Sequence, residues 1–234
     1  MTETTTTTTT TTTQQPAPKM PPPAFRLAHP PSLESYNTPA RAWLAAHAKP
    51  WDGLATGALV FDRRGRVLLL QRAAHDSMPL RWETPGGGAD DDDPSLLAAC
   101  ARELWEEAGL EAVRVVRVVS EGAATEPGSV FTNRTGTVVW CRFAFEVRVR
   151  QTGDGDGDGN GDGNGDGDGD EMQVRIDPDE HADYVWASEE EVRRERVGDK
   201  EIPITNGQMA RLILDGFRRR REEPVEGEGE VVQG

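Results

Sequence analysis

Residues 81–110 read RWETPGGGADDDDPSLLAACARELWEEAGL, and the end of this stretch gathers three glutamates where a helix must stop. On a helix, the like charges of Glu103, Glu106 and Glu107 repel each other by about a few tenths of a kcal/mol per pair. The negative end of the helix dipole adds to this penalty. A solvated helix face tolerates such an arrangement, but a bound cation explains it better.

The glutamates are expected on a helix over residues 94–108, after three glycines and an acidic run. Asp93 is expected to cap its N-terminus, Pro94 to take its first position and Gly109 to end it in the left-handed conformation. The apolar side of this helix is made of Leu97, Ala101, Leu104 and Ala108. Around the helix, the three glutamates lie next to this apolar side. The helix therefore packs its apolar side on the core and holds the three carboxylates close together at the edge of the core.

The rest of the chain alternates strand and helix patterns. Apolar spacing and stop signals predict helices at residues 38–48, 188–195 and 206–221. Apolar and β-branched runs predict two strands around a turn within residues 54–73, and further strands at 80–84, 113–121, 137–149, 171–176 and 182–188. The alternation is looser than in regular βαβ units, which predicts an α/β fold with a mixed β-sheet between helices.

A single domain is expected over residues 25–221, with three segments of unusual composition around or within it. Residues 1–24 hold a threonine run followed by prolines and are expected to be a disordered leader. Residues 152–171 are rich in glycine and aspartate and are expected to be a flexible insertion between strands. Residues 222–234 are expected to be an acidic, disordered tail.

The formal net charge of −15 is concentrated in two of these segments. The insertion contributes seven aspartates and the tail five glutamates, and residues 153–170 and 222–234 contain no basic residue. The expected folded part is therefore near neutral, and no nucleic-acid binding is expected. The arginine run at residues 218–221 is expected to stabilise the C-terminal end of a helix dipole instead.

The sequence does not read as a secretory signal, a mitochondrial presequence or a membrane span. A soluble, cytoplasmic protein without a membrane partner is therefore expected. Cys100 and Cys141 lack metal-like spacing and are expected to be buried as small hydrophobic residues. The sequence carries no signal for the oligomeric state.

The segment RELWEEAGL, together with the glycines before it, resembles the box of the Nudix hydrolases. That box reads Gly, five residues, Glu, seven residues, then Arg-Glu-aliphatic-any-Glu-Glu-any-Gly-aliphatic, and residues 102–110 match its second half at every defined position. Counting back from this half places the box glycine at Gly88 and the box glutamate at Pro94. If Gly87 is the box glycine, Asp93 takes the glutamate's place in a segment one residue longer. We favour the second alignment because Asp93 keeps a carboxylate there.

The resemblance implies a Nudix-like α/β/α sandwich that hydrolyses a nucleoside diphosphate linked to another group, with a small nucleotide-type molecule as its substrate. It also implies Mg²⁺ or Mn²⁺, held by the carboxylates of Glu103, Glu106 and Glu107 and by a backbone oxygen of Gly87. Oxygen ligands suit these hard cations, which neutralise the charge of a diphosphate during attack by water. Glu103 would deprotonate the water, Glu106 would also act in catalysis, and Arg102 would orient a carboxylate of the cluster.

Other residues have both a functional and a structural interpretation. Arg72 and Glu83 are candidates for substrate binding, and Glu83 also for the metal shell, although a strand-end arginine is more often only exposed. Glu180 and His181 lie where some relatives place another acid or base, but a loop acid is usually only solvated. An alternative function is a Nudix-like module that binds a nucleotide or a protein without cleaving it, because the box glutamate is missing. The resemblance covers about residues 40–217, and it does not identify the group attached to the diphosphate.

Overall fold

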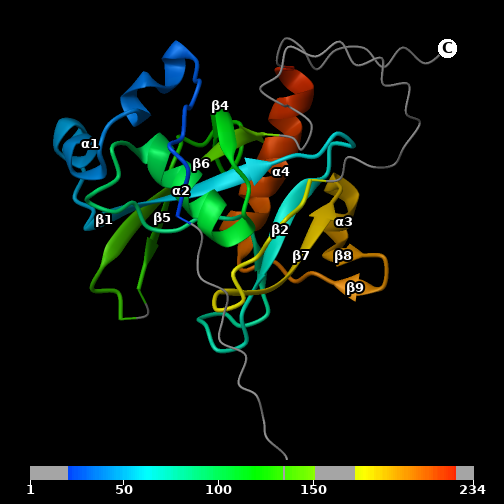
Figure 1. The fold of residues 1–234 in the computed structure, drawn as a ribbon. Coiled ribbons are helices and arrows are strands. Elements are labelled where there is room, and N and C mark those ends of the chain that lie inside the picture. The colour runs from blue at the N-terminus through cyan, green and yellow to red at the C-terminus, as the bar shows by residue number, and fades with distance from the viewer. Residues whose placement is uncertain (1–20, 134, 151–171, 225–234) are drawn as a thin grey trace, which may run out of the picture.

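In the computed structural model, residues 21–133, 135–150 and 172–224 are the ones that the structure describes (Figure 1). Within them, the helices are η1 (Pro31–Tyr36, a 3₁₀ helix), α1 (Ala40–His47), α2 (Leu96–Ala108), α3 (Glu189–Arg194) and α4 (Gly207–Glu222). The strands are β1 (Gly53–Val60), β2 (Val67–Arg72), β3 (Trp82–Glu83), β4 (Ala112–Val119), β5 (Ser129–Thr132), β6 (Val139–Val149), β7 (His181–Ala187), β8 (Arg196–Val197) and β9 (Lys200–Glu201). The insertion expected at residues 152–171 lies outside the described residues, as do most of the expected leader and tail.

The strands form two main sheets and a short hairpin. The first sheet has the order β1-β6-β4, and β5 also pairs with β6. β1 runs parallel to β6, whereas β4 and β5 run antiparallel to it, so this sheet is mixed as predicted. The second sheet has the antiparallel order β3-β2-β7, and β8 pairs with β9. The sequence pattern does not reveal this division into two sheets, because each strand alone fits either one.

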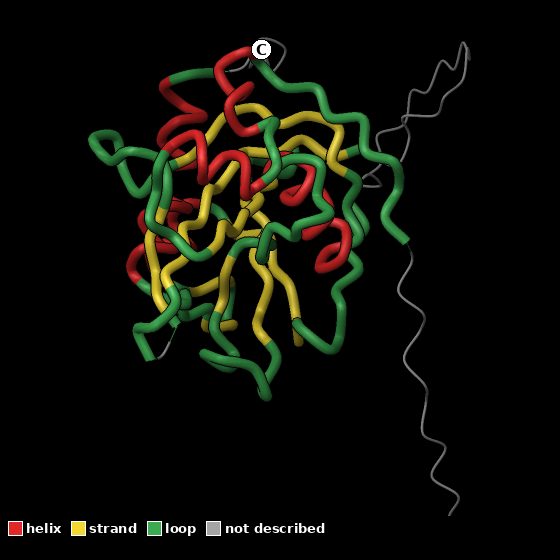
Figure 2. Tube along the Cα trace, turned by 90° about the vertical axis from the view of Figure 1, so that its left-hand side faces the viewer, coloured by secondary structure: helices red, strands yellow, loops and turns green. Residues whose placement is uncertain are grey.

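Alternate residues of the central strands face two different hydrophobic cores. On β2, Leu68 and Leu70 belong to the core that contains the apolar side of α2, whereas Leu69 belongs to the core that contains the apolar side of α4. Successive side chains of a strand point to opposite faces, so helices cover both faces of the strands. Figure 2 shows helices on either side of the strands, which confirms the predicted α/β/α sandwich.

The helix that carries the glutamates begins two residues later than predicted. Its N-cap is Ser95, whose hydroxyl oxygen accepts a hydrogen bond from the N–H of Ala98 at 3.1 Å. The prediction of Asp93 as the cap is wrong, because its carboxylate binds the guanidinium of Arg102 instead. Gly109 ends the helix with a φ of 67°, as predicted. The predicted apolar side is buried along its whole length, at Leu97, Ala101, Leu104 and Ala108.

Other differences from the predicted elements involve short segments. Residues 172–176 do not form a strand, although their sequence favours one. The N–H of Arg175 donates instead to the carbonyl oxygen of Ala108 at the end of α2, at 2.8 Å. The elements η1, β5, β8 and β9 are not predicted, because each has at most six residues and apolar periodicity alone does not reveal such short elements.

Cys100 and Cys141 are both buried, and neither forms a disulfide. Burial raises the pKa of both thiols, to about 12 for Cys141. A thiol that stays protonated at neutral pH is a poor nucleophile and a poor metal ligand. The structure therefore confirms that both cysteines act as small hydrophobic residues.

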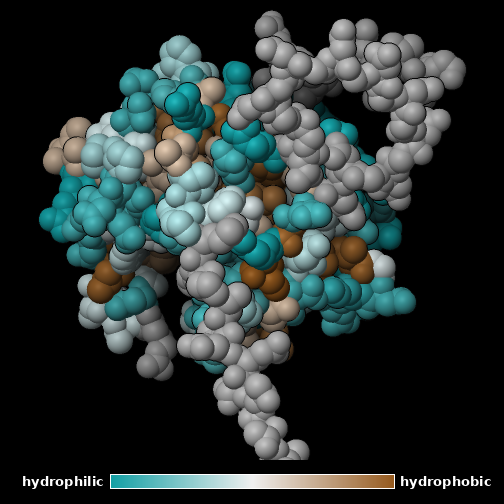
Figure 3. All heavy atoms as spheres, viewed as in Figure 1, coloured by the Kyte–Doolittle hydropathy of each residue, from teal (hydrophilic) through white to brown (hydrophobic). Residues whose placement is uncertain are grey.

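On the face shown in Figure 3, the surface is mostly hydrophilic with separate hydrophobic patches. Over all described residues, the large exposed hydrophobic side chains are Met78, Leu80, Val130, Phe131 and Tyr184. The arginine run lies at the end of α4, where Arg218 binds Asp215 at 2.8 Å and Arg220 binds Glu146 at 2.6 Å. The lack of nucleic-acid binding remains a prediction. None of the helices in the described ranges is long and apolar enough to cross a membrane.

Candidate functional site

The triple-glycine bend after Pro85 runs along β1 and is held to it by backbone hydrogen bonds. The N–H of Thr56 donates to the carbonyl oxygen of Gly87 at 2.8 Å, and the N–H of Ala58 donates to that of Pro85 at 2.8 Å. Between them, Gly86 has a φ of 147°, and a Cβ atom there would lie 2.2 Å from the carbonyl oxygen of Thr56. Glycine is required at this position for its backbone conformation and for the close approach of the two segments.

Two glutamates of α2 lie against this bend. Glu107 Oε2 accepts a hydrogen bond from the N–H of Gly86 at 2.7 Å. A Cβ atom on Gly87 would lie 2.6 Å from Glu103 Oε2, so the carboxylate occupies the space that a side chain would need. The carbonyl oxygen of Gly87, the predicted backbone metal ligand, accepts one hydrogen bond from Thr56 and keeps a second lone pair. The glycines therefore allow the helix to bring its carboxylates against the backbone.

Arg102 binds carboxylates through each of its guanidinium nitrogens. Nε and Nη2 donate to the two oxygens of Asp93 at 3.0 and 2.9 Å. Nη1 donates to Glu103 at 2.9 Å and to Glu106 at 3.0 Å, and Nη2 also donates to the carbonyl oxygen of Gly88 at 2.9 Å. The hydrogen bond to Asp93 is the main cause of the raised Arg102 pKa. This pairing favours the alignment in which Asp93 replaces the box glutamate, since a proline offers no carboxylate.

The three glutamates of α2 differ in burial. Glu103 and Glu107 are 9% and 7% exposed, whereas Glu106 is exposed. The pKa of Glu103 is raised to about 7, and burial is the main cause. The charges of Glu106 and Glu180 also raise it, whereas the charge and the hydrogen bond of Arg102 lower it. Burial also raises the pKa of Glu107 well above its ordinary value, opposed by one backbone N–H. Two adjacent carboxylates that are costly to ionise favour the binding of a cation.

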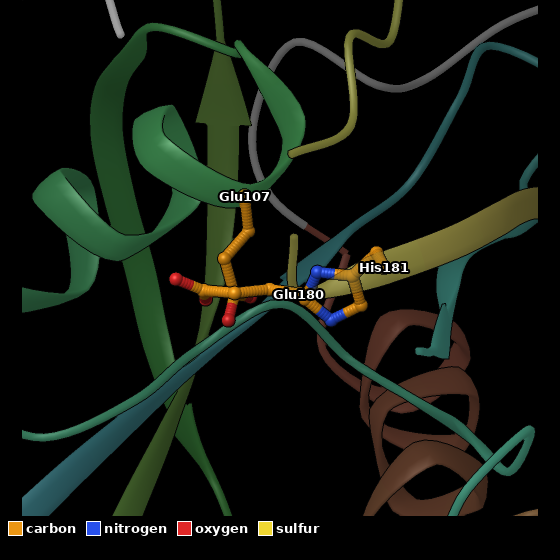
Figure 4. Close-up of side chains that lie close together, drawn as sticks. All are labelled: Glu107, Glu180 and His181. Atoms are coloured by element: carbon orange, nitrogen blue, oxygen red, sulfur yellow. The ribbon is translucent and has the colours of Figure 1, made fainter. Parts of the chain in front are cut away.

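Glu180 and His181, where β7 begins, extend this cluster beside Glu107 (Figure 4). One possible ligand atom from each of the three side chains lies within 4.8 Å of the other two. Burial lowers the pKa of His181, so its imidazole is neutral near pH 7. The sequence suggested these two residues only as an additional acid or base, and that role remains a prediction.

Arg72 and Glu83, the predicted substrate-binding residues, form an ion pair with each other. Arg72 also binds the carboxylate of Asp76 and, at 2.6 Å, the carbonyl oxygen of Ser77, so it holds the loop that follows β2. The charge of Glu83 contributes to the raised pKa of Glu107, which places Glu83 at the border of the carboxylate cluster. A substrate contact for either residue remains a prediction.

A cavity of about 630 Å³ opens beside the same loop. Its walls include Met78 and Arg81 from the loop, and Asn206 and Ala210 from the start of α4. Met78 and Leu80 have positive φ values of 52° and 59°, an unusual conformation for residues of this size. The volume falls within the usual range of small-molecule sites. The sequence patterns did not indicate this cavity, because its walls come from segments far apart in the chain.

The donor atoms of the cluster fit a hard divalent cation. Its carboxylates come from Glu103, Glu106, Glu107 and Glu180. His181 adds a buried Nδ1 that has no hydrogen-bond partner among the described residues. Mg²⁺ and Mn²⁺ bind carboxylate oxygens, and either cation would neutralise the buried negative charge.

Curated proteins resemble short stretches of this chain. An RNA pyrophosphohydrolase of Bartonella quintana (strain Toulouse) is 38% identical over 66 residues, which are 26% of this chain and 38% of that protein. A CTP pyrophosphohydrolase of Escherichia coli (strain K12) is 42% identical over 55 residues, which are 24% of this chain and 40% of that protein. The chain therefore spans well under half the length of these curated relatives.

Solved structures resemble a larger part of the chain. The MutT protein from Methanosarcina mazei Go1 has a TM-score of 0.48 and 22% identity, over 75% of this chain and 98% of that one. The E. coli ORF135 protein has a TM-score of 0.49 and 22% identity, over 74% of this chain and 94% of that one. A family model described as the NUDIX domain matches residues 51–206. That range is more than half of the chain and contains both the glycine bend and the glutamate helix, so the chain belongs to the NUDIX domain family.

Proposed function

We propose that this protein is a metal-dependent pyrophosphohydrolase that cleaves the diphosphate linkage of a nucleoside diphosphate joined to another moiety. The observation that carries the proposal is the meeting of Glu103 and Glu107, both buried and both with raised pKa values, at the triple-glycine bend. Membership of the NUDIX domain family supports the same chemistry. The names of the two relatives, an RNA and a CTP pyrophosphohydrolase, support the same type of bond.

The side chains of the site have separate parts in this reaction. The ligands of a Mg²⁺ or Mn²⁺ ion would be the carboxylates of Glu103, Glu106 and Glu107 and the carbonyl oxygen of Gly87. A bound cation would neutralise the negative charge of the diphosphate. Arg102 fixes the carboxylates of Glu103 and Glu106 through Nη1. Glu103 would also take a proton from the attacking water, while its Oε1 accepts the hydrogen bond from Arg102 that holds the carboxylate in place.

The cavity beside the loop after β2 is proposed to hold the nucleoside or the group attached to it. Arg81 lines the cavity, and Glu83, two residues later, borders the carboxylate cluster. Two residues of chain span at most about 7 Å, a distance that a nucleotide bridges. A substrate can therefore place its diphosphate at the cluster while another part of it occupies the cavity.

An activity screen tests this proposal. The full chain is incubated with Mg²⁺, Mn²⁺ or a chelator and with dinucleoside polyphosphates, ADP-ribose, nucleotide sugars, coenzyme A, oxidised dNTPs, CTP and RNA carrying a 5′-triphosphate. Metal-dependent release of phosphate-containing products is the expected result. Thermal stabilisation by one of these compounds without any product would overturn the proposal and favour a module that only binds its ligand.

A further inference from the structure

We infer that His181 supplies an imidazole nitrogen to a metal position shared with Glu107 and Glu180, and that this nitrogen makes the position prefer Mn²⁺ to Mg²⁺. The inference rests on the proposed function, because Glu107 also belongs to the glutamate cluster proposed for catalysis. It adds a ligand that the box does not contain. It also identifies which of the two candidate cations the site favours.

The spacing of the three side chains fits a single ion. Their ligand atoms lie within 4.8 Å of one another. Around an octahedral ion with bonds of about 2.1 Å, neighbouring ligand atoms lie about 3 Å apart and opposite ones about 4.2 Å apart. Small rotations of the side chains are therefore enough for all three to reach one ion.

The burial of His181 gives an independent indication of a ligand. Its side chain is 3% exposed, and its Nδ1 has no hydrogen-bond partner among the residues that the structure describes. Figure 4 shows the imidazole ring facing the carboxylates of Glu107 and Glu180. A buried ring nitrogen without a partner is unfavourable, and a metal ion at the carboxylates would satisfy it.

Backbone hydrogen bonds between distant segments bring these side chains together. The N–H of Asp177 donates to the carbonyl oxygen of Glu107 at 3.4 Å, and the N–H of His181 donates to that of Asp177 at 2.8 Å. The N–H of Ala73, just after β2, donates to the carbonyl oxygen of Glu180 at 2.8 Å. The end of α2 and the start of β7 are therefore fixed relative to each other, as a preformed metal position requires.

The mixed ligand set distinguishes this position from the rest of the cluster. Glu103 and Glu106 offer only oxygen atoms, which suit Mg²⁺. An imidazole nitrogen suits transition ions, which include Mn²⁺, better than it suits Mg²⁺. Replacing the imidazole by an oxygen ligand should therefore change the preference between the ions without abolishing metal binding.

Pulsed electron paramagnetic resonance of the full chain loaded with Mn²⁺, without substrate, tests the ligand directly. We expect electron spin echo modulation from a coordinated ¹⁴N nucleus in the wild type. His181→Phe keeps a ring of similar size and should abolish the modulation. His75→Phe, which changes an exposed histidine, is the matched control and should retain it. Bound Mn²⁺ without nitrogen modulation in the wild type would overturn the inference.

Titration calorimetry with Mn²⁺ and Mg²⁺ gives the second measurement. His181→Phe should weaken Mn²⁺ binding by at least about tenfold and leave Mg²⁺ binding within about twofold. His181→Asn, which offers an amide oxygen, should retain metal binding with a smaller preference for Mn²⁺, and it replaces the Phe variant if that one does not fold. Equal Mn²⁺ affinity in the wild type and the variants would overturn the inference.

The two proposals fail in different ways. If the protein shows nitrogen coordination of Mn²⁺ but cleaves no diphosphate compound with any cation, the proposed function fails and the metal position stands. If it cleaves such compounds but shows no nitrogen coordination, the inference about His181 fails and the proposed function stands.

Discussion

Asp93 and Arg102 form a two-point contact beside the first turn of α2, with Nε to Oδ1 at 3.0 Å and Nη2 to Oδ2 at 2.9 Å. Asp93 is buried, and its second oxygen also accepts a hydrogen bond from the N–H of Asp90 at 2.8 Å. The same guanidinium holds Glu103 and Glu106. Asp93 therefore acts on the proposed catalytic carboxylates through Arg102.

Asp93→Ala should lower both stability and turnover. Removing a buried carboxylate leaves the guanidinium of Arg102 without its bidentate partner, at a cost of about 1–3 kcal/mol in the free energy of unfolding. Urea denaturation measures this loss, and Asp93→Glu should recover part of it. Asp92→Ala changes an exposed residue of the same run and is the control. A loss as large in the control would mean that the ion pair with Arg102 is not the cause.

Glu106→Gln should reduce Mg²⁺-dependent turnover by at least about 100-fold, because a proposed metal ligand loses its charge. Its thermal stability should be nearly unchanged, since Glu106 is exposed and an amide oxygen can still accept the hydrogen bond from Arg102. Steady-state kinetics and thermal unfolding measure the two effects. Glu190→Gln, at an exposed ion pair on α3, is the control. Wild-type activity in Glu106→Gln would argue against a catalytic role.

In the metal-free protein, the contribution of Glu103 to stability should fall as the pH rises from about 4.5 through 7. Burial raises the pKa of Glu103 from 4.5 to about 7, so in this window the folded state binds more protons than the unfolded state. The free energy of unfolding then falls with pH, by about 3 kcal/mol for Glu103 alone. Chemical denaturation across this range measures the slope, which Glu103→Gln and added Mn²⁺ should both reduce. An identical slope in Glu103→Gln would exclude this carboxylate as the cause.

Gly86→Ala should destabilise the protein far more than Gly65→Ala. Both glycines have positive φ values, of 147° and 74°, but the new Cβ at position 86 would lie 2.2 Å from the carbonyl oxygen of Thr56. At position 65 nothing lies within 4 Å, so only the conformational cost of about 1–2 kcal/mol remains. Thermal unfolding of the two variants compares them. Equal losses would show that the contact between the bend and β1 contributes little.

Ala210→Trp should raise KM more than it lowers kcat, because it fills the cavity proposed for the group attached to the diphosphate. The same change at the exposed Ala46 of α1 is the matched control. Steady-state kinetics with the substrate found in the activity screen measures both constants. An unchanged KM in Ala210→Trp would place the attached group elsewhere.

Local patterns predict the parts of the site that lie on one element. The apolar side of α2, its end at Gly109 and the grouping of its glutamates follow from spacing along one helix. The predicted cap at Asp93 is wrong because two local roles compete for this residue. Its carboxylate binds Arg102, and the hydroxyl of Ser95 caps the helix instead.

Contacts between distant segments could not be predicted in this way. The position of His181 against Glu107 depends on hydrogen bonds between residues 175–177 and the end of α2, which leave no periodic signal in the sequence. The ion pair of Arg72 with Glu83 depends on the pairing of β2 with β3. The division into two sheets depends on strand partners in the same way.

On both sides of residues 151–171, the chain is hydrogen-bonded to the C-terminal end of α2 or to the short connection between α2 and β4. The N–H of Arg150 donates to the carbonyl oxygen of Glu111, and the N–H of Arg175 donates to that of Ala108, both at 2.8 Å. These two backbone contacts lie on the described chain, so the place of the α2 carboxylates does not depend on how many residues separate Arg150 from Arg175.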